Sequence, residues 1–589
     1  MNDKVTRQIE TMKRGYILDP NRILADYRKE IAEIRGYHGR ELLELLQNAV
    51  DELGGTNDRS VSVVLRDHVL TISNNGSLFT FEGFISLMYS NLSPKHNKNE
   101  YIGNKGTGFR SILNWADRIR IYSGDLSVEF SGEYAQETLT ELQENAGVAE
   151  FCASHDEVKL ATLVAPRLIP PLHNKNHDTV IEVELKSNVV DKVLGQIQQI
   201  NSKTILFLEK LEKLNVEYNG DVLLFQKDPP ERDNDVYDVM ITTKKNDEII
   251  ERDKWVVLSR EGEFEKQKYG VMVAYKEDMS AVPDVLYSYF KTKVQFPVHA
   301  LVHATFDLNA ERNHLSETEA NKHILRVVCD TLVELALRAT SEDVNYAALS
   351  LLSTIRDFPS ELNWDDFSIN EYYLDAVAAN CVFPTVNGKY ISFDEKPKFY
   401  YSNIADFLHG DAFETLMPST ENIEIRNLLK AISKHRKLGT RYSYNEITTG
   451  INVTLPSLQI RERAALWLAF VNEYKNEISS DLKPHFVIDS NGKAVIDGQQ
   501  VFLPAENINF SSPPDFTKIV FMHKDLVAAL RDMQGKDGSL RILATELSKF
   551  DVREYNLVNI VCRLLLEKKK SAHQASKKTR GCYEETVEW

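Results

Sequence analysis

The segment ELLELLQNAVDEL (41–53) has the leucine spacing of a core helix, yet a polar stripe runs along it. Glu44, Asn48 and Asp51 are spaced i, i+4 and i+7, so in a helix they share one face. A carboxylate held there can take a proton from water, and a carboxamide oxygen is a hard ligand of the kind that Mg2+ binds. A helix whose polar face only meets water has the same spacing, so the stripe alone does not decide between the two.

Two glycine-containing segments follow the stripe. SNNGSLF (73–79) places Asn74 and Gly76 in a turn after two predicted strands, and GNKGTGF (103–109) has a G-x-x-G-x-G spacing before a predicted helix. Such glycines let backbone N–H groups approach a phosphate chain, and a helix N-terminus favours an anion. The residues of interest in the second segment are Gly103, Lys105, Gly106, Gly108 and Phe109.

In this order, the helix, the turn and the loop resemble the nucleotide site of the GHKL ATPases, the group of gyrase, heat-shock chaperones, histidine kinases and MutL. The chain is most similar to the sacsin-like branch of that group. The resemblance extends to about residue 330 and is vague beyond it. It is carried by ELLQNAVDE, SNNGSLFT, YIGNKGTGFRSI, HDTVIEVEL and FPVHALVHATFDLNAERNHL.

The resemblance implies an ATP site that works with Mg2+. By position, Glu44 would be the general base that aligns water on the γ-phosphate, Asn48 would bind Mg2+, and Asp51 would support the site. The glycine-rich loop would hold the phosphates, with Lys105 adding positive charge. Thr179 would reach the adenine region through water.

The turn departs from the usual pattern of the group. Most members have an aspartate where this chain has Asn74, and a second glycine where it has Leu78. An asparagine oxygen also accepts a hydrogen bond from the adenine amino group, so adenine recognition is still implied, with weaker discrimination against guanine. The sacsin-like branch often has an apolar residue and phenylalanine after an NxG turn, as Leu78 and Phe79 are here.

Arg312, in NAERNHL, is the candidate residue from a second domain. In the group, such a basic side chain reaches the γ-phosphate when the lid closes and offsets charge that develops in phosphoryl transfer. The alternative is a surface arginine paired with Glu311 or Glu317. Lys293 is a weaker candidate for the same role.

Other segments carry weaker expectations. The loop 91–102 would be the lid over ATP, with Lys95 and Lys98 either near phosphate or in solvent. The first 18 residues would form an arm that crosses to a partner. His299 and His303 alternate in a predicted strand, which suits either a metal site or, as we expect, ordinary core or surface histidines.

The elements that must position these residues are mixed. Helices are predicted at 18–53 and 81–90, and strands at 60–73 and 179–186, without the strict alternation of a doubly wound parallel sheet. The predicted fold class is therefore α+β and multidomain: a GHKL (Bergerat) α/β sandwich that binds ATP (1–195), a transducer-like middle domain (196–345), and a mixed C-terminal α/β region (346–589). That region has two Asn-Gly-Lys hairpin-like modules, at 381–400 and 485–504, and a predicted linker at 567–580. The abrupt end suggests a chain that once continued.

Composition narrows the class of protein. No apolar run approaches the roughly 20 residues that cross a bilayer, and the N-terminus has no signal-peptide core. Five cysteines are scattered without a CxxC pair, which indicates reduced, mostly buried thiols and a cytoplasmic protein. A formal charge of -17 disfavours a surface that wraps duplex DNA, so direct nucleic-acid binding is not indicated.

The sequence therefore predicts a slow ATPase that acts as a conformational switch and forms a homodimer when ATP binds. The resemblance suggests a chaperone-like machine with a client protein, or a sensor ATPase of microbial antiviral defence that acts with an effector such as a nuclease. Two alternatives are a non-hydrolysing nucleotide-binding scaffold and a DNA-transaction ATPase of the MutL kind. A histidine kinase is disfavoured because no helix pair with a phosphorylatable histidine precedes the site.

Overall fold

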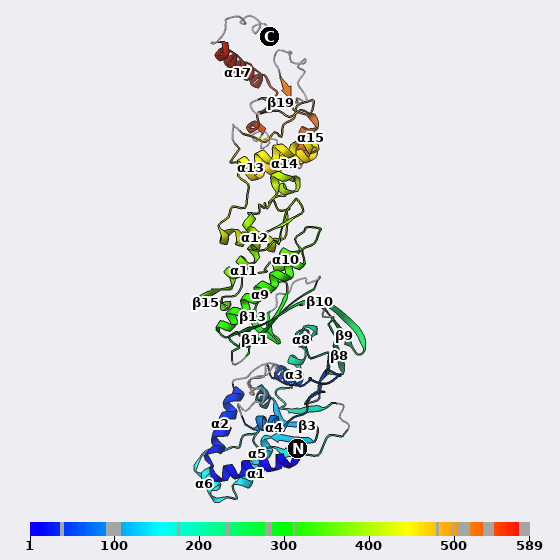
Figure 1. The fold of residues 1–589 in the computed structure, drawn as a ribbon, viewed down its shortest axis with the longest axis vertical. Helices are drawn as coiled ribbons and strands as arrows, with labels where there is room; N and C mark the ends of the chain where they lie inside the picture. Colours follow the sequence, from blue (N-terminus) through cyan, green and yellow to red (C-terminus); the bar gives the residue numbers. More distant parts are fainter. Residues whose placement is uncertain are drawn as a thin grey trace. The chain divides into compact units, whose positions relative to one another are not determined.

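A computed structural model describes residues 1–35, 40–89, 108–173, 177–230, 235–276, 285–309, 312–478, 482–496, 499–504, 519–533 and 547–575. The chain divides into two compact units (Figure 1). The first comprises Met1–Leu335 and Thr354–Tyr373, and the second comprises Ala336–Ser353 and Leu374–Trp589. The protein is thus a mixed α/β protein of more than one domain.

One continuous sheet runs through the first unit, in the order β13-β12-β14-β11-β10-β9-β8-β7-β1-β2-β6-β3-β4-β5. Neighbouring strands are antiparallel except for β1 with β7 and β12 with β14, which are parallel. The strands are β1 (Ser60–Arg66), β2 (Val69–Asn74), β3 (Ala116–Ser123), β4 (Leu126–Ser131), β5 (Arg167–Leu168), β6 (Thr179–Leu185), β7 (Lys213–Tyr218), β8 (Asp221–Lys227), β9 (Val236–Lys245), β10 (Glu248–Phe264), β11 (Gln267–Tyr275), β12 (Val285–Ser288), β13 (Phe290–Gln295) and β14 (Leu301–Ala304).

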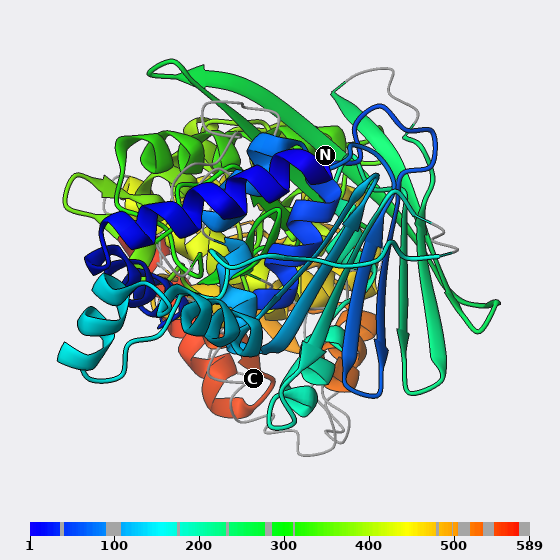
Figure 2. The same ribbon diagram turned by 90° about the horizontal axis from the view of Figure 1, so that it is seen from below.

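Helices pack on the N-terminal part of this sheet, and Figure 2 shows the first helices of the chain along one face of its strands. The helical elements of this unit are α1 (Asn2–Leu18), α2 (Asn21–Arg35), α3 (Glu41–Asp51), α4 (Phe81–Met88), η1 (Gly108–Asn114), α5 (Gly132–Leu142), α6 (Ala146–Ser154), α7 (Val190–Ile197), α8 (Ser202–Leu206) and η2 (Ser360–Leu362). Helices α9 (Glu319–Arg338) and α11 (Ile369–Ala378) begin in this unit, which also has the short pair β15 (Asn363–Trp364) and β16 (Phe367–Ser368).

The hairpin predicted at 60–73 is confirmed. Val61, Val63 and Leu65 alternate along β1 and are buried, as strand periodicity requires when one face lies on the core. The tight turn falls at Asp67, whose φ of 52° lies in the left-handed region that aspartate tolerates better than most residues. The predicted strand at 179–186 is likewise present as β6.

The N-terminal arm is not observed. Residues 2–18 form α1, and Val5, Met12 and Tyr16 are buried in the core of the first unit. The predicted helical stretch 18–53 is divided into α2 and α3. The pattern did not show these features because α1 is largely polar and only every third or fourth side chain faces the core.

The second unit has mostly short elements: α10 (Ala347–Leu352), β17 (Phe383–Pro384), β18 (Tyr390–Ile391), η3 (Phe393–Glu395), η4 (Asn403–Phe407), η5 (Asp411–Phe413), α12 (Ile423–Arg436), α13 (Tyr444–Thr454), η6 (Leu455–Ser457), α14 (Ile460–Tyr474), β19 (Val501–Leu503), β20 (Val520–Phe521), α15 (Lys524–Met533), β21 (Val552–Glu554) and α17 (Leu557–Ala575). Both Asn-Gly-Lys turns close short antiparallel pairings, β17 with β18 and Ile488 with Ala494. Gly388 and Gly492 have φ of 72° and 79° there, a conformation that favours glycine.

Two expectations about the chain need correction. The linker predicted at 567–580 begins inside α17, which continues to Ala575, because lysine, alanine and glutamine favour helix even where the composition is polar. The cysteines are not mostly buried: Cys329 is buried and Cys152 half-buried, but Cys381 and Cys562 are exposed. Among the helices that the structure describes, none is both long and apolar enough to cross a membrane.

Candidate functional site

The polar stripe of α3 lies in the core of the first unit. The apolar face, including Leu42, Leu45 and Leu46, is fully buried, and this anchors the helix on the sheet. On the stripe, Glu44 and Asp51 are 3% and 2% exposed, and Asn48 is half-buried. Burying two carboxylates on one helix is costly unless something compensates them. The simple solvent-facing helix is therefore excluded.

Arg312 provides the compensation for Glu44. Its Nη1 lies 3.1 Å from Glu44 Oε1 and donates to Gln47 Oε1 at 2.9 Å. Both charged side chains are at least 86% buried, since their exposed fractions are 14% and 4%. Arg312 therefore pairs with the predicted general base and not with Glu317.

A constrained turn presents Arg312 to α3. Its φ of 54° is left-handed, which is unusual for arginine, and its N–H donates to Asn309 O at 2.9 Å. Asn309 Oδ1 accepts the N–H groups of Asn313 and His314. From α3's side, Arg40 donates to the carbonyl oxygen of Arg312. Backbone strain that is held by surrounding bonds in this way is typical of functional positions.

Burial is the largest influence on the Glu44 carboxyl, and it raises its pKa above the ordinary value. Arg312 and Arg40 lower the pKa, and Asp51 raises it further. A raised pKa means that the neutral acid is more favoured in the folded protein than in the unfolded chain. The stabilisation from this preference is complete below the unfolded pKa of about 4.3 and is lost as the pH rises through the folded pKa.

Glu44→Gln, which is neutral at every pH, should therefore gain in free energy of unfolding relative to the wild type as the pH rises from 4 to 8. Denaturant titrations of both proteins across this range test the expectation. A difference between the two proteins that stays constant with pH would contradict it.

The NxG turn and β6 bring the adenine candidates together. Asn74 ends β2 directly opposite Thr179, the first residue of β6, and both side chains are buried. Thr179 Oγ1 shares a hydrogen bond of 2.7 Å with Ser123 Oγ at the end of β3. Asn74 Nδ2 donates to Asn75 O at 3.1 Å. Two buried polar residues thus lie at paired positions at the ends of adjacent strands.

Gly76 joins this turn to the end of α3 and to the start of β6. Its N–H donates to Asp178 Oδ2 at 2.9 Å, and the next residue, Ser77, donates to Glu52 O at 2.8 Å. Gly76 has a φ of 119°, and a Cβ at this position would lie 2.1 Å from Glu52 O. The close approach of the backbone at the turn thus requires glycine.

Gly76→Ala should lower the free energy of unfolding by at least about 2 kcal/mol, because the alanine meets both strain and a backbone clash. Gly54→Ala is the matched control, since its Cβ would meet nothing within 4 Å and its φ is not left-handed. Urea titration of both variants measures the difference. Equal stabilities would show that the turn adjusts without cost.

Most of the predicted phosphate loop lies outside the described residues, including Gly103, Lys105 and Gly106. The predicted lid segment 91–102, with Lys95 and Lys98, also lies outside them. The structure describes the loop's exit. Gly108 begins η1, and Phe109 is buried. Arg110 follows, with its Nε 3.2 Å from Glu33 and its Nη2 donating to Leu87 O at 2.9 Å. These bonds anchor the end of the loop to α2 and α4.

Three polar residues at the candidate site were not predicted from the sequence. Gln47 on α3 and Arg40, the N-cap residue of that helix, bond Arg312, and Ser123 bonds Thr179. The sequence signal that could have identified Gln47 is its position three residues after Glu44, which places both side chains on one face of the helix. Its Nε2 is buried and has no hydrogen-bond partner in the described part of the chain.

The structure also describes Lys293 and His303, the weaker candidates from the sequence. The side chain of Lys293 is exposed, and its backbone N–H supports the Arg312 turn by donating to Asn313 O. His303 is 1% exposed and stacks on Phe207, so it is a core histidine as expected. No cluster of metal-binding side chains occurs among the residues that the structure describes.

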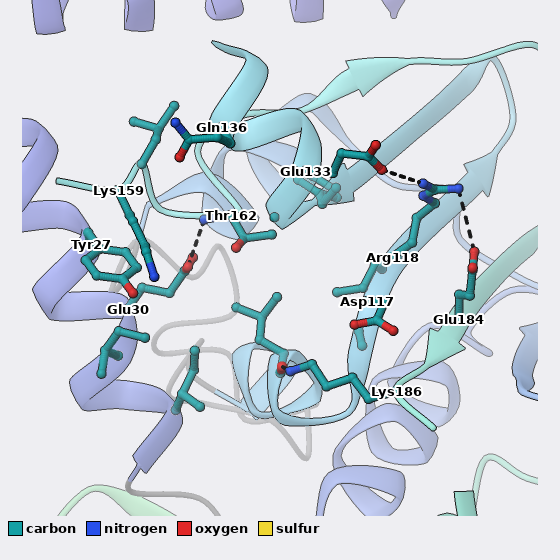
Figure 3. Close-up of a pocket in the computed structure, with 18 residues that line it drawn as sticks. Tyr27, Glu30, Asp117, Arg118, Glu133, Gln136, Lys159, Thr162, Glu184 and Lys186 are labelled. Carbon is teal, nitrogen blue, oxygen red and sulfur yellow. Dashed lines mark hydrogen bonds and ion pairs between the residues drawn. The ribbon is translucent and has the colours of Figure 1, made fainter. Parts of the chain in front are cut away.

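A separate cavity of about 500 Å3 lies between α2, α5 and the start of β3, and Figure 3 shows its lining. Several of its charged side chains are paired with one another or with the backbone: Arg118 bridges Glu133 and Glu184, and Glu30 accepts the N–H of Thr162 at 2.8 Å. It adjoins the beginning of β3 and the end of β6, whereas Thr179 is at the opposite end of β6. No predicted site residue lines it.

No protein-family model matches the chain, and no curated protein is similar enough to count as a match.

Proposed function

We propose that the first unit is a Mg2+-dependent ATPase of the sacsin-like GHKL type that works as a conformational switch. The observation that carries the proposal is the buried contact of Arg312 with Glu44 and Gln47. In this contact the predicted general base lies beside the predicted transducer arginine, although the two residues are far apart in the sequence of the unit. A carboxylate that can act as a general base and a cation that can offset developing negative charge are the two groups that phosphoryl transfer uses.

The described residues fit Mg·ATP in their chemistry. Asn48 offers a carboxamide oxygen on the half-buried part of the stripe, which suits Mg2+, and bound Mg2+ would neutralise charge on the phosphates. Among the described residues, the buried Nε2 of Gln47 has no acceptor, as expected for a donor that bonds a ligand oxygen. Asn74 and Thr179 would read the adenine edge through the asparagine oxygen and the threonine hydroxyl.

The switch follows from competition for Arg312. In the structure this arginine bonds Glu44 and Gln47, and a γ-phosphate would attract the same guanidinium more strongly because it carries more negative charge. ATP would then shift the population toward a state in which Arg312 contacts phosphate and Glu44 faces water. Hydrolysis would restore the pair. We place the protein in the cytoplasm and expect ATP to favour a homodimer.

The biological role proposed for the switch rests on the sequence resemblance alone. It is either chaperone-like work on a client protein or sensing in antiviral defence with a separate effector such as a nuclease.

The experiment combines phosphate release with a conformational readout. Purified protein is assayed for Mg2+-dependent phosphate release, and its protease sensitivity is compared without nucleotide, with ADP and with a non-hydrolysable ATP analogue. We expect slow release and a cleavage pattern that only the ATP analogue changes. If ATP binds but no phosphate is released, the protein is a nucleotide-binding scaffold and not an ATPase. If phosphate is released but the cleavage pattern does not change with the ATP analogue, the protein does not act as a conformational switch.

A further inference from the structure

A stripe of exposed aliphatic side chains runs along α17 in the second unit. We define the α17 stripe as Leu557, Val558, Val561, Leu565 and Leu566, whose exposed fractions lie between 44% and 70%. Successive residues of a helix are about 100° apart, so these five and Cys562 share one side over three turns. Cys562 is also exposed.

The opposite side of α17 is already packed. Ile560 is fully buried against Phe502 and Tyr555, and Leu564 packs on the same cluster. The α17 stripe therefore does not face the core of its own unit. Five clustered aliphatic side chains expose on the order of several hundred Å2, a patch of the size that marks an interaction site on a soluble protein.

Charges of opposite sign flank the stripe. Exposed Lys568 and Lys569 follow it on α17, and exposed Glu554 precedes it at the end of β21. Two copies of the helix that pack in an antiparallel arrangement bring the lysine end of one against the Glu554 end of the other. In a parallel pair, lysines would instead face lysines, which is unfavourable.

We propose that the α17 stripe is the interface of a homodimer in which α17 pairs antiparallel with α17 of a second copy. The two-fold axis passes between residues 561 and 562. This axis places Leu557 opposite Leu566, Val558 opposite Leu565 and Val561 opposite Cys562. In this arrangement, apolar side chains face apolar side chains and lysines face glutamates. The surface is therefore complementary to a second copy of itself, as an isologous contact requires.

One helix pair buries less surface than the 1,200 Å2 or so at the lower end of stable interfaces. The dimer should therefore be reversible, with a dissociation constant of about 1–100 µM. It forms without nucleotide and uses the second unit, so it neither needs nor tests the ATPase proposal.

Light scattering on the full chain without nucleotide tests the association. We expect a mass that rises with concentration from 67.3 kDa toward twice that value. Leu565→Glu should stay monomeric, whereas Val453→Glu, on an equally exposed aliphatic residue of α13, should behave as the wild type. A wild type that is monomeric at 100 µM or so overturns the proposal and means that the chain's own residues or another protein covers the stripe.

Charge exchange tests the antiparallel arrangement. Lys569→Glu should weaken the dimer several-fold, and adding Glu554→Lys to it should restore the affinity. A short bis-maleimide should link two copies through Cys562 in a variant with serine at Cys381 and Cys582, and Cys562→Ser should abolish the link. The antiparallel arrangement is overturned if the double variant does not regain the affinity of the wild type. It is also overturned if a dimeric sample gives no cross-link through Cys562.

Discussion

Replacing Glu44 with glutamine is expected to slow ATP hydrolysis at least about 100-fold while ATP still binds. The carboxylate is the only proposed base at the site, and it lies on α3 with its side chain 4% exposed. Glutamine keeps the shape and can still accept a bond from Arg312, but it cannot take a proton from water. Single-turnover phosphate release under saturating Mg·ATP measures the chemical step.

Glu41→Gln is the matched control for this substitution. Glu41 is equally buried on the same helix, but its carboxylate is bound by Lys192 and Gln196 on α7 and not by Arg312. We expect Glu41→Gln to lower stability and to leave the rate constant of the folded protein within a few-fold of wild type. If both variants lose turnover equally, or if Glu44→Gln retains it, Glu44 is not the base.

Arg312→Ala should give the second large effect, a loss of about 100- to 1,000-fold in turnover, because the developing phosphate charge loses its cation. The same change removes the partner of a buried carboxylate. Breaking a buried ion pair costs about 3 kcal/mol, and Arg40 would offset part of this. Turnover and urea titration on one preparation separate the two consequences.

Lys293→Ala distinguishes the two candidate cations. Its side chain is exposed on β13, beside the turn that holds Arg312, so we expect little change in turnover or stability. Arg312→Lys should recover part of the turnover but not the paired contact with Glu44 and Gln47, because lysine lacks the planar fork of donors. A large loss in Lys293→Ala with normal turnover in Arg312→Ala would transfer the role to Lys293.

The local elements of the fold could be predicted from the sequence. The β1–β2 hairpin and β6 follow from alternation of apolar residues, and α3 follows from leucine spacing. The polar stripe of α3 could also be recognised from its spacing, although the spacing alone did not distinguish a site from a helix face in water. Those signals lie within a few residues of one another.

The remaining features depend on contacts that no local pattern contains. Arg312 and Gln47 are 265 residues apart, and only the family resemblance suggested that Arg312 approaches the site. The parallel pairing of β1 with β7, which makes one sheet of the first unit, is equally non-local. Residues 567–575 were misjudged for another reason: a polar, lysine-rich composition indicates solvation but does not exclude a helix.

The most direct test of the central claim is a calorimetric titration of Mg·ATP into Glu44→Gln, in which hydrolysis cannot obscure binding. The account predicts one ATP per chain, weaker binding of Mg·GTP, and loss of binding in Gly76→Ala when that variant remains folded. Absence of any binding up to millimolar Mg·ATP, in a folded sample, would contradict the assignment of the first unit as an ATP site.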